Sequence, residues 1–207
     1  MSFAGFLEND FDVFHIDGLE SRMEGIRTQI QPKFKKIGEA ILNDTSLLAG
    51  HEMFVHIAQH ARRKVNAPVD TWMAFCENKR GYKQYPHFQI GLFDDRVFVW
   101  LALIYELPSK RKIAETYLEH LPDLLRHIPD HFEISPDHMK KDSFRVSDLG
   151  EQGVRDLLER FRDVNKAELL IGRTFARTDP QVHRAAFLDT VKDTFSTLAP
   201  LYGMARS

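Results

Sequence analysis

The chain has 207 residues, of which 43% are hydrophobic and 28% charged, and both shares are ordinary for a globular protein. Its formal net charge of -2 excludes a strong overall attraction to nucleic acid or to anionic membranes. Cys76 is the single cysteine, so an intrachain disulfide is excluded, and this fits a reducing compartment. The length suits one domain, and we expect a single domain over residues 1–207.

No segment has the pattern of a targeting sequence or a membrane helix. Residues 1–11 carry Glu8 and Asp10, and they lack the basic start and the long apolar stretch of a signal peptide. The longest apolar run, residues 97–104, is far shorter than the ~20 residues that a membrane helix needs. We therefore expect a cytoplasmic protein with no membrane partner.

Amphipathic helices are predicted on both sides of a β-rich middle. Hydrophobic residues repeat at helical spacing from Leu19 to Ile41, and Pro32 kinks or restarts this helix. Pro108 opens a second helical region, which Pro122 interrupts. A further helix follows residue 148, and a last one carries Pro180 in its first turn.

The middle of the chain changes to a strand pattern. Residues rich in Phe, Val, Ile and Trp alternate with loops containing Pro, Gly, Asn or Asp, which predicts strands at residues 53–61, 71–77, 86–93 and 96–105. Strands this close in sequence favour an antiparallel meander. Shorter strands are expected at 132–134, 144–146 and 167–175. The prediction is a two-layer α+β fold, with an antiparallel sheet of about five or six strands built on a central meander, residues 53–105.

The two faces of this sheet differ in chemistry. A loop of two or four residues around Asp94 and Asp95 fixes one register for the last hairpin. One face is then wholly apolar and has to be covered by helices. The other face pairs polar or small residues with small or aromatic ones: His87 with Ala102, Gln89 with Trp100, and Gly91 with Phe98.

The preceding strands repeat this mixture, with His56, His60 and Trp72 in the corresponding rows. If these rows share one face, the small residues leave room above the sheet, and the histidines and tryptophans wall a pocket or groove. The alternative is that a C-terminal helix packs on this face and the small residues admit it.

His56 and His60 are the most tempting metal-binding pair. On a helix their spacing would let both rings reach one ion. On a strand, four residues separate them by roughly 13 Å, which is too far. Because the segment has a strand pattern, we expect no metal at this pair.

Two basic loops follow the first two strands. The first contains Arg62, Arg63 and Lys64, and the second runs from Lys79 through Arg80 and Tyr82 to Lys83. Guanidinium groups bind phosphate or carboxylate, and a tyrosine ring stacks on a base. The alternative is a solvated surface whose charges are balanced by nearby Asp and Glu.

No local motif encodes a reaction. Asp137 and His138 form a polar step in an irregular segment, but an isolated Asp-His step does not by itself indicate a site. Cys76 lies between apolar neighbours and is interpreted as a core thiol. The sequence has no glycine-rich phosphate loop, no nucleophile elbow and no pair of cysteines.

Long strings of the sequence resemble the YktB-like family of uncharacterised bacterial proteins. They include GHEMFVHIAQHARR from Gly50, KRGYK from Lys79, PHFQIGL from Pro86 and KAELL from Lys166. The resemblance covers nearly the whole chain; Met139 departs from it, since the family tends to have Thr there. It implies an α+β fold with an antiparallel sheet and no activity, because the family is one of unknown function.

The leading hypothesis is a small-ligand-binding or enzymatic domain for an anionic or aromatic ligand. The predicted floor residues are His56, His60, His87, Gln89 and Trp100. The predicted rim residues are Arg62, Arg63, Arg80 and Lys83, with Tyr82 stacking on the ligand. His60 and His87 are the acid–base candidates. The alternatives are a single-stranded nucleic-acid-binding protein using the same loops, and a protein-interaction module; no cofactor is indicated.

Overall fold

The computed structural model describes residues 2–61 and 63–206. Its α-helices are α1 (Glu8–Asp12), α2 (Leu19–Gly25), α3 (Gln31–Ala49), α4 (Lys110–Glu119), α5 (Leu121–His127), α6 (Val146–Asp163) and α7 (Phe187–Arg206). Its strands are β1 (Phe54–Ile57), β2 (Asp70–Cys76), β3 (His87–Phe93), β4 (Arg96–Leu103), β5 (Glu133–Ser135), β6 (Phe144–Arg145) and β7 (Leu169–Ala176). Short helical turns are η1 (Val13–His15), η2 (Ile26–Ile30) and η3 (Tyr82–Gln84). None of the helices in the described ranges is long and apolar enough to cross a bilayer.

The strands form one antiparallel sheet in the order β1-β2-β3-β4-β7-β5-β6. The first four strands follow the chain as consecutive neighbours, which confirms the predicted meander. Strand β7 returns from the C-terminal half to pair with β4, and β5 and β6 extend the sheet beyond it. The α+β prediction is confirmed, and the seven strands exceed the predicted five or six.

The register of the last hairpin agrees with the prediction. His87 lies opposite Ala102, and Gln89 lies opposite Trp100. The same register continues into β7, where Gly172 lies opposite Trp100. Since side chains alternate along a strand, these residues lie on one face of the sheet.

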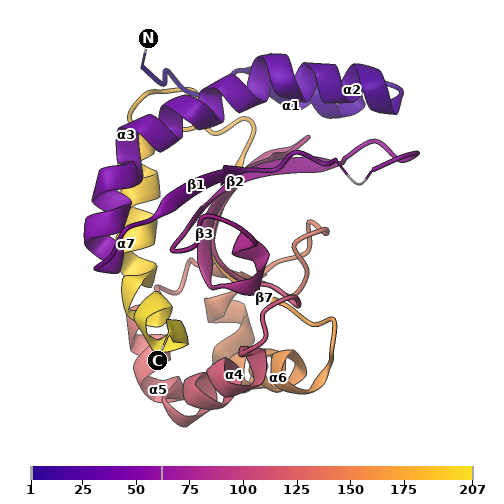
Figure 1. The fold of residues 1–207 in the computed structure, drawn as a ribbon. Coiled ribbons are helices and arrows are strands. Elements are labelled where there is room, and N and C mark those ends of the chain that lie inside the picture. Colours follow the sequence, from indigo (N-terminus) through magenta and orange to yellow (C-terminus); the bar gives the residue numbers. More distant parts are fainter. Residues whose placement is uncertain (1, 62, 207) are drawn as a thin grey trace.

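Helices cover the apolar face. Phe195 of α7 packs against Phe75 and Phe88, with ring centroids 5.8 and 4.6 Å apart, and Tyr202 stacks on Phe88 at 5.0 Å. Figure 1 shows α7 beside α3 along one side of the sheet, with α4, α5 and α6 grouped near the C-terminal end of α7. The C-terminal helix therefore packs on the apolar face, so it does not fill the face that carries the histidines.

Two predicted boundaries were wrong. The last helix begins at Phe187 and not near Pro180: residues 180–186 form turns, in which the Val182 carbonyl accepts a hydrogen bond from the Phe6 N–H (2.8 Å). Strand β1 ends at Ile57 and does not reach residue 61, because the chain turns at His60, whose φ is 50°. The strand therefore ends early, but the His60 ring still lies against Trp72, with which the sequence grouped it.

Candidate functional site

The polar and small residues of the sheet share one surface, which we call the mixed face. It comprises Phe54, His56, Ala58, Asp70, Trp72, Ala74, Cys76, His87, Gln89, Gly91, Phe93, Phe98, Trp100, Ala102, Leu170, Gly172 and Thr174. Part of it forms a second buried cluster, separate from the main core, whose largest side chains are Trp72, Phe93, Phe98 and Trp100. The mixed face is therefore largely covered, and its open part has to be located from the geometry.

The room expected above the small residues is filled by aromatic rings at the centre of the sheet. A Cβ at Gly91 would lie 2.2 Å from Phe98 Cζ, and one at Gly172 would lie 2.9 Å from Trp100 Cε3. The two rings lie over bare backbone and stack on each other, with centroids 6.3 Å apart. Trp100 is consequently 5% exposed and is part of the packing.

An open cavity of about 470 Å³ remains at the β1–β2 end of the mixed face. We call it the Trp72 cavity. Its lining residues are Ile57, Ala58, Gln59, His60, Ala61, Arg63, Trp72, Gly81, Tyr82, Lys83, Glu106, His138 and Met139. A larger hollow of about 940 Å³ lies on the other side of the β1–β2 connection, against α2, and shares Gln59, His60, Ala61 and Arg63 with it.

Four side chains converge on the Trp72 ring. Its indole N–H donates a hydrogen bond to Tyr82 Oη at 2.8 Å. His60 and His138 both meet the ring edge-on, with centroids 5.5 and 5.6 Å away. Lys83 Nζ lies 5.3 Å from the ring centroid, within the range of a cation–π contact. The cavity therefore combines aromatic walls with imidazole and ammonium groups.

Tyr82 is fixed from two further sides. It stacks on His56 with centroids 4.9 Å apart and meets the edge of His87 at 5.1 Å. Burial raises the pKa of the Tyr82 phenol to about 12, so it is neutral at physiological pH. His56 Nε2 is hydrogen-bonded to the Asn78 carbonyl at 2.8 Å. This predicted floor residue therefore packs against Tyr82 and does not itself line the cavity.

His87 and Gln89 lie beneath the surface. His87 is 0% exposed, its Nδ1–H donates to the Tyr85 carbonyl (2.8 Å), and its Nε2 accepts a hydrogen bond from Gln89 (2.9 Å). Burial lowers the pKa of His87 to about 4, which keeps the ring neutral. Neither residue lines the Trp72 cavity, so the structure separates them from His60, with which the sequence grouped them.

Only some residues of the predicted basic rim line the cavity. Arg63 and Lys83 line the cavity, whereas Arg80 is exposed and does not. Arg62 lies outside the described residues. Lys83 Nζ is 3.9 Å from Glu106 Oε1, a long ion pair at the edge of the opening.

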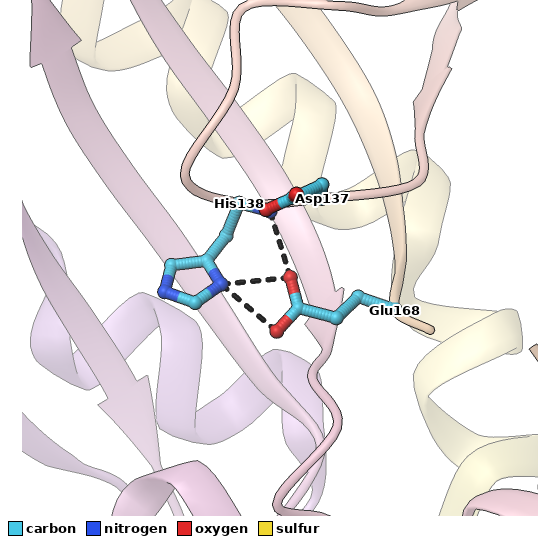
Figure 2. Close-up of side chains that lie close together, drawn as sticks. All are labelled: Asp137, His138 and Glu168. Atoms are coloured by element: carbon cyan, nitrogen blue, oxygen red, sulfur yellow. Dashed lines mark hydrogen bonds and ion pairs between the residues drawn. The ribbon is translucent and has the colours of Figure 1, made fainter. Parts of the chain in front are cut away.

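His138, which lines the cavity, is hydrogen-bonded to the buried Glu168 outside it, and this contact was not predicted from the sequence. His138 Nδ1 lies 2.7 Å from Glu168 Oε2 and 2.9 Å from Oε1, and the His138 backbone N–H donates to Oε2 at 2.7 Å (Figure 2). Glu168, immediately before β7, is 3% exposed. A carboxylate between apolar Ala167 and Leu169 was the available signal, because a buried acid requires partners.

Asp70, the first residue of β2, is a second buried carboxylate. It is 0% exposed, and neither carboxylate oxygen receives a hydrogen bond from another residue in the described ranges. Burial raises the pKa of Asp70 to about 6, and the charges of Arg63 and Lys83 act against this increase. Asp70 thus lies within electrostatic reach of the cations that line the cavity.

Asp137, His138 and Glu168 have ligand atoms within 4.8 Å of one another, which is close enough for a metal centre. Their existing contacts favour a different interpretation. Asp137 Oδ1 accepts a hydrogen bond from the Met139 N–H at 2.9 Å, and Glu168 is occupied by His138. We therefore interpret the cluster as a hydrogen-bonded histidine–carboxylate pair.

Comparison with known proteins identifies the family. Residues 6–202 match the model of the domain of unknown function DUF1054. The UPF0637 protein of Oceanobacillus iheyensis is 50% identical over 202 residues, covering 97% of this chain and 96% of that protein. The UPF0637 protein of Shouchella clausii is 50% identical over 206 residues, covering 99% and 96%. The resemblance to a family of uncharacterised bacterial proteins is confirmed, and the chain belongs to the DUF1054 family.

Proposed function

We propose that this protein binds a small anionic molecule with an aromatic part in the Trp72 cavity. One observation supports this more than any other: His60, Tyr82 and Lys83 from two loops, and His138 from a distant segment of the chain, all converge on Trp72. Loops that bring aromatic and polar groups together over a rigid sheet are a common way to build a ligand site.

The dimensions of the cavity suit a metabolite. Its volume of about 470 Å³ falls within the ~300–1,000 Å³ of typical small-molecule sites. Trp72 and Tyr82 supply apolar wall, and Met139 is a flexible side chain at the opening. A planar ring is therefore the part of the ligand that we expect inside.

The charges favour an anion. Arg63 and Lys83 both line the cavity, and the pair between Lys83 and Glu106 is long enough for a phosphate or carboxylate to compete with it. Burial, reinforced by the Arg63 and Lys83 charges, lowers the pKa of His60 to about 4. At neutral pH His60 therefore offers a hydrogen bond and not a charge.

The test is a binding measurement with three probes: phenyl phosphate, adenosine monophosphate and inorganic phosphate. Thermal shift and tryptophan fluorescence report binding, because Trp72 lies in the cavity wall. We expect the two aromatic probes to raise the melting temperature and to change the fluorescence, and inorganic phosphate to do so weakly. No response to either aromatic probe overturns the proposal.

A matched pair of variants separates the cavity from general surface charge. Lys83→Met removes a lining cation, whereas Arg80→Met removes an exposed one outside the cavity. We expect the first to weaken binding of phenyl phosphate at least tenfold and the second to leave it unchanged. Equal effects would favour the alternative, binding of single-stranded nucleic acid to the basic loops, whose affinity falls steeply with salt.

We also propose a cytoplasmic location, which stays a prediction. It is supported by the absence of a disulfide partner for Cys76, the single cysteine of the sequence. Fractionation of cells expressing the protein at its natural level tests it, and recovery in a secreted fraction would contradict it.

A further inference from the structure

We propose that His138 is the proton acceptor of the Trp72 cavity and that Glu168 is the residue that positions it. This proposal rests on the proposed function in one respect, because the proton donor is the ligand, or a water beside it, bound in that cavity. It adds a reaction type, general acid–base catalysis, and a reacting atom, His138 Nε2.

The hydrogen bonds of Glu168 fix the protonation of His138. Glu168 is 3% exposed and accepts hydrogen bonds from the backbone N–H groups of His138 (2.7 Å) and Tyr105 (3.4 Å). Donors from the backbone stabilise the ionised carboxylate, which can only accept further hydrogen bonds. His138 Nδ1, 2.7 Å from Oε2, must therefore carry the proton. The neutral ring then has its lone pair on Nε2.

The lone pair faces the cavity. Figure 2 shows the second ring nitrogen of His138 on the side of the imidazole that points away from Glu168. The ring meets the edge of Trp72 at 5.6 Å and lines the cavity. Within residues 2–61 and 63–206, no hydrogen bond to Nε2 is formed. A fixed acceptor without a protein partner is left for a ligand.

The geometry indicates a substrate with an O–H group, or a water next to the bound ligand. In the step, the O–H bond breaks and an Nε2–H bond forms, while the oxygen keeps the electron pair and becomes an alkoxide or hydroxide. The Nδ1–H bond is kept and its hydrogen bond to Glu168 remains, so the pair changes from a carboxylate beside a neutral imidazole to a carboxylate beside an imidazolium. The net charge of the pair goes from -1 to 0, and return of the proton from Nε2 to the same oxygen restores it.

Glu168 contributes in two ways. It selects the tautomer that leaves Nε2 unprotonated, and its charge stabilises the imidazolium that forms. It does not line the cavity and therefore acts only through His138. Asp137 is the neighbouring carboxylate, but its Oδ1 accepts a hydrogen bond from the Met139 N–H. A variant at Asp137 is therefore the matched control for the loss of the Glu168 carboxylate.

The experiment uses the ligand-free protein labelled with ¹⁵N in its imidazole rings. Long-range ¹H–¹⁵N spectra distinguish protonated from unprotonated ring nitrogens. At pH 8 we expect His138 with Nδ1 protonated and Nε2 unprotonated, in the wild type and in Asp137→Asn. In Glu168→Ala we expect the Nε2 signal to move toward the protonated position. The wild-type spectrum decides the tautomer even if the Glu168 variant does not fold.

Reactivity is the second readout. Diethyl pyrocarbonate acylates an unprotonated imidazole nitrogen that it can reach, and mass spectrometry measures the rate at His138. We expect modification at Nε2, at least threefold slower in Glu168→Gln than in the wild type and unchanged in Asp137→Asn. A purely structural histidine would not show this dependence on Glu168.

Three outcomes overturn the inference: a wild-type His138 protonated on Nε2, a His138 that diethyl pyrocarbonate does not modify, or zinc binding that shifts Nδ1 and is abolished by Asp137→Asn. All are measured without ligand. The inference can therefore fail while phenyl phosphate still binds in a Lys83-dependent way, which distinguishes its failure from a failure of the proposed function.

Discussion

The Phe98 ring occupies the space that a side chain at position 91 would need. Gly91 and Phe98 are directly opposed on β3 and β4, and a Cβ added to Gly91 would lie 2.2 Å from Phe98 Cζ and 2.6 Å from the Thr71 carbonyl oxygen. The ring lies across bare backbone and seals the centre of the mixed face. This contact is one reason why the cavity is confined to the Trp72 end.

Gly91→Ala is therefore expected to destabilise the protein. The new methyl group meets backbone on one side and a buried ring on the other, and overpacking of this kind costs about 1–3 kcal/mol. Urea unfolding measures the change. The control is Gly203→Ala in α7, where a Cβ meets nothing within 4 Å and helix propensity predicts a gain of up to about 1 kcal/mol. A loss of equal size at both positions would contradict the packing argument.

Asp70→Asn is expected to stabilise the protein near neutral pH. Burial raises the pKa of Asp70 from 3.8 to about 6, so the folded state binds more protons than the unfolded state between these values. The stability that Asp70 contributes is thus present below pH 4 and is lost as the pH rises through 6. The penalty removed at pH 7 is on the order of 1–3 kcal/mol.

The pH dependence isolates this effect. Burial lowers the pKa values of His60 and His87 from 6.5 to about 4. Because the unfolded state then binds more protons than the folded state, these two histidines make the free energy of unfolding rise with pH between those values. We therefore compare urea unfolding of Asp70→Asn with the wild type at pH 4.5 and pH 7. The difference should grow with pH, while Asp130→Asn, at an exposed position, should show no such growth. A constant difference would mean that Asp70 is ionised throughout.

Tyr82→Phe removes the hydroxyl that accepts the Trp72 indole N–H at 2.8 Å. The ring stack on His56 is kept, but a largely buried donor loses its partner, which costs about 1–3 kcal/mol. Urea unfolding and tryptophan emission report the change. Tyr105→Phe, at a residue 43% exposed, should have little effect on either measurement. Unchanged stability in Tyr82→Phe would show that water replaces the hydroxyl.

Lys141→Met is expected to loosen the segment that carries His138. Lys141 forms ion pairs with Asp94 and with Asp95 (3.2 Å) across the β3–β4 turn, and its carbonyl accepts from Arg96 at 3.2 Å. Partly exposed ion pairs contribute about 0–1 kcal/mol, so global stability should change little.

Hydrogen exchange is the measurement for this variant. We expect faster exchange at residues 136–142 in Lys141→Met and wild-type exchange in Lys140→Met, whose side chain reaches only Asp137, at 3.8 Å. Equal exchange in both variants would show that the Glu168 contact alone orders the segment.

Local patterns predicted the architecture well. The alternation in β3 and β4 and the two aspartates of their turn were enough to place His87 opposite Ala102, because an even-length hairpin allows one register. The division into an apolar and a mixed face followed from the same alternation. The prediction failed where the backbone departs from periodic geometry, as at His60, whose positive φ lies in a segment that was predicted to be strand up to residue 61.

The candidate site was predicted only in part. Of the residues proposed from the sequence, His60, Arg63, Tyr82 and Lys83 line the cavity, because the segments that follow the antiparallel strands β1 and β2 both come back to the Trp72 side chain. His87, Gln89 and Trp100 share the face but are buried, since alternation fixes the side of the sheet and not what covers it.

The sequence by itself determined the fold class, the register of the β3–β4 hairpin and the chemistry of each face, because these depend on local periodicity and on neighbours within one hairpin. Only the tertiary structure decided which part of the mixed face is open and which histidine has a carboxylate partner. His138 and Glu168 are thirty residues apart, and the pairing of β7 with β5 brings them together, because Ser135 lies opposite Leu170. Contacts of this kind leave no periodic signal, because they depend on how distant elements pack and not on local spacing.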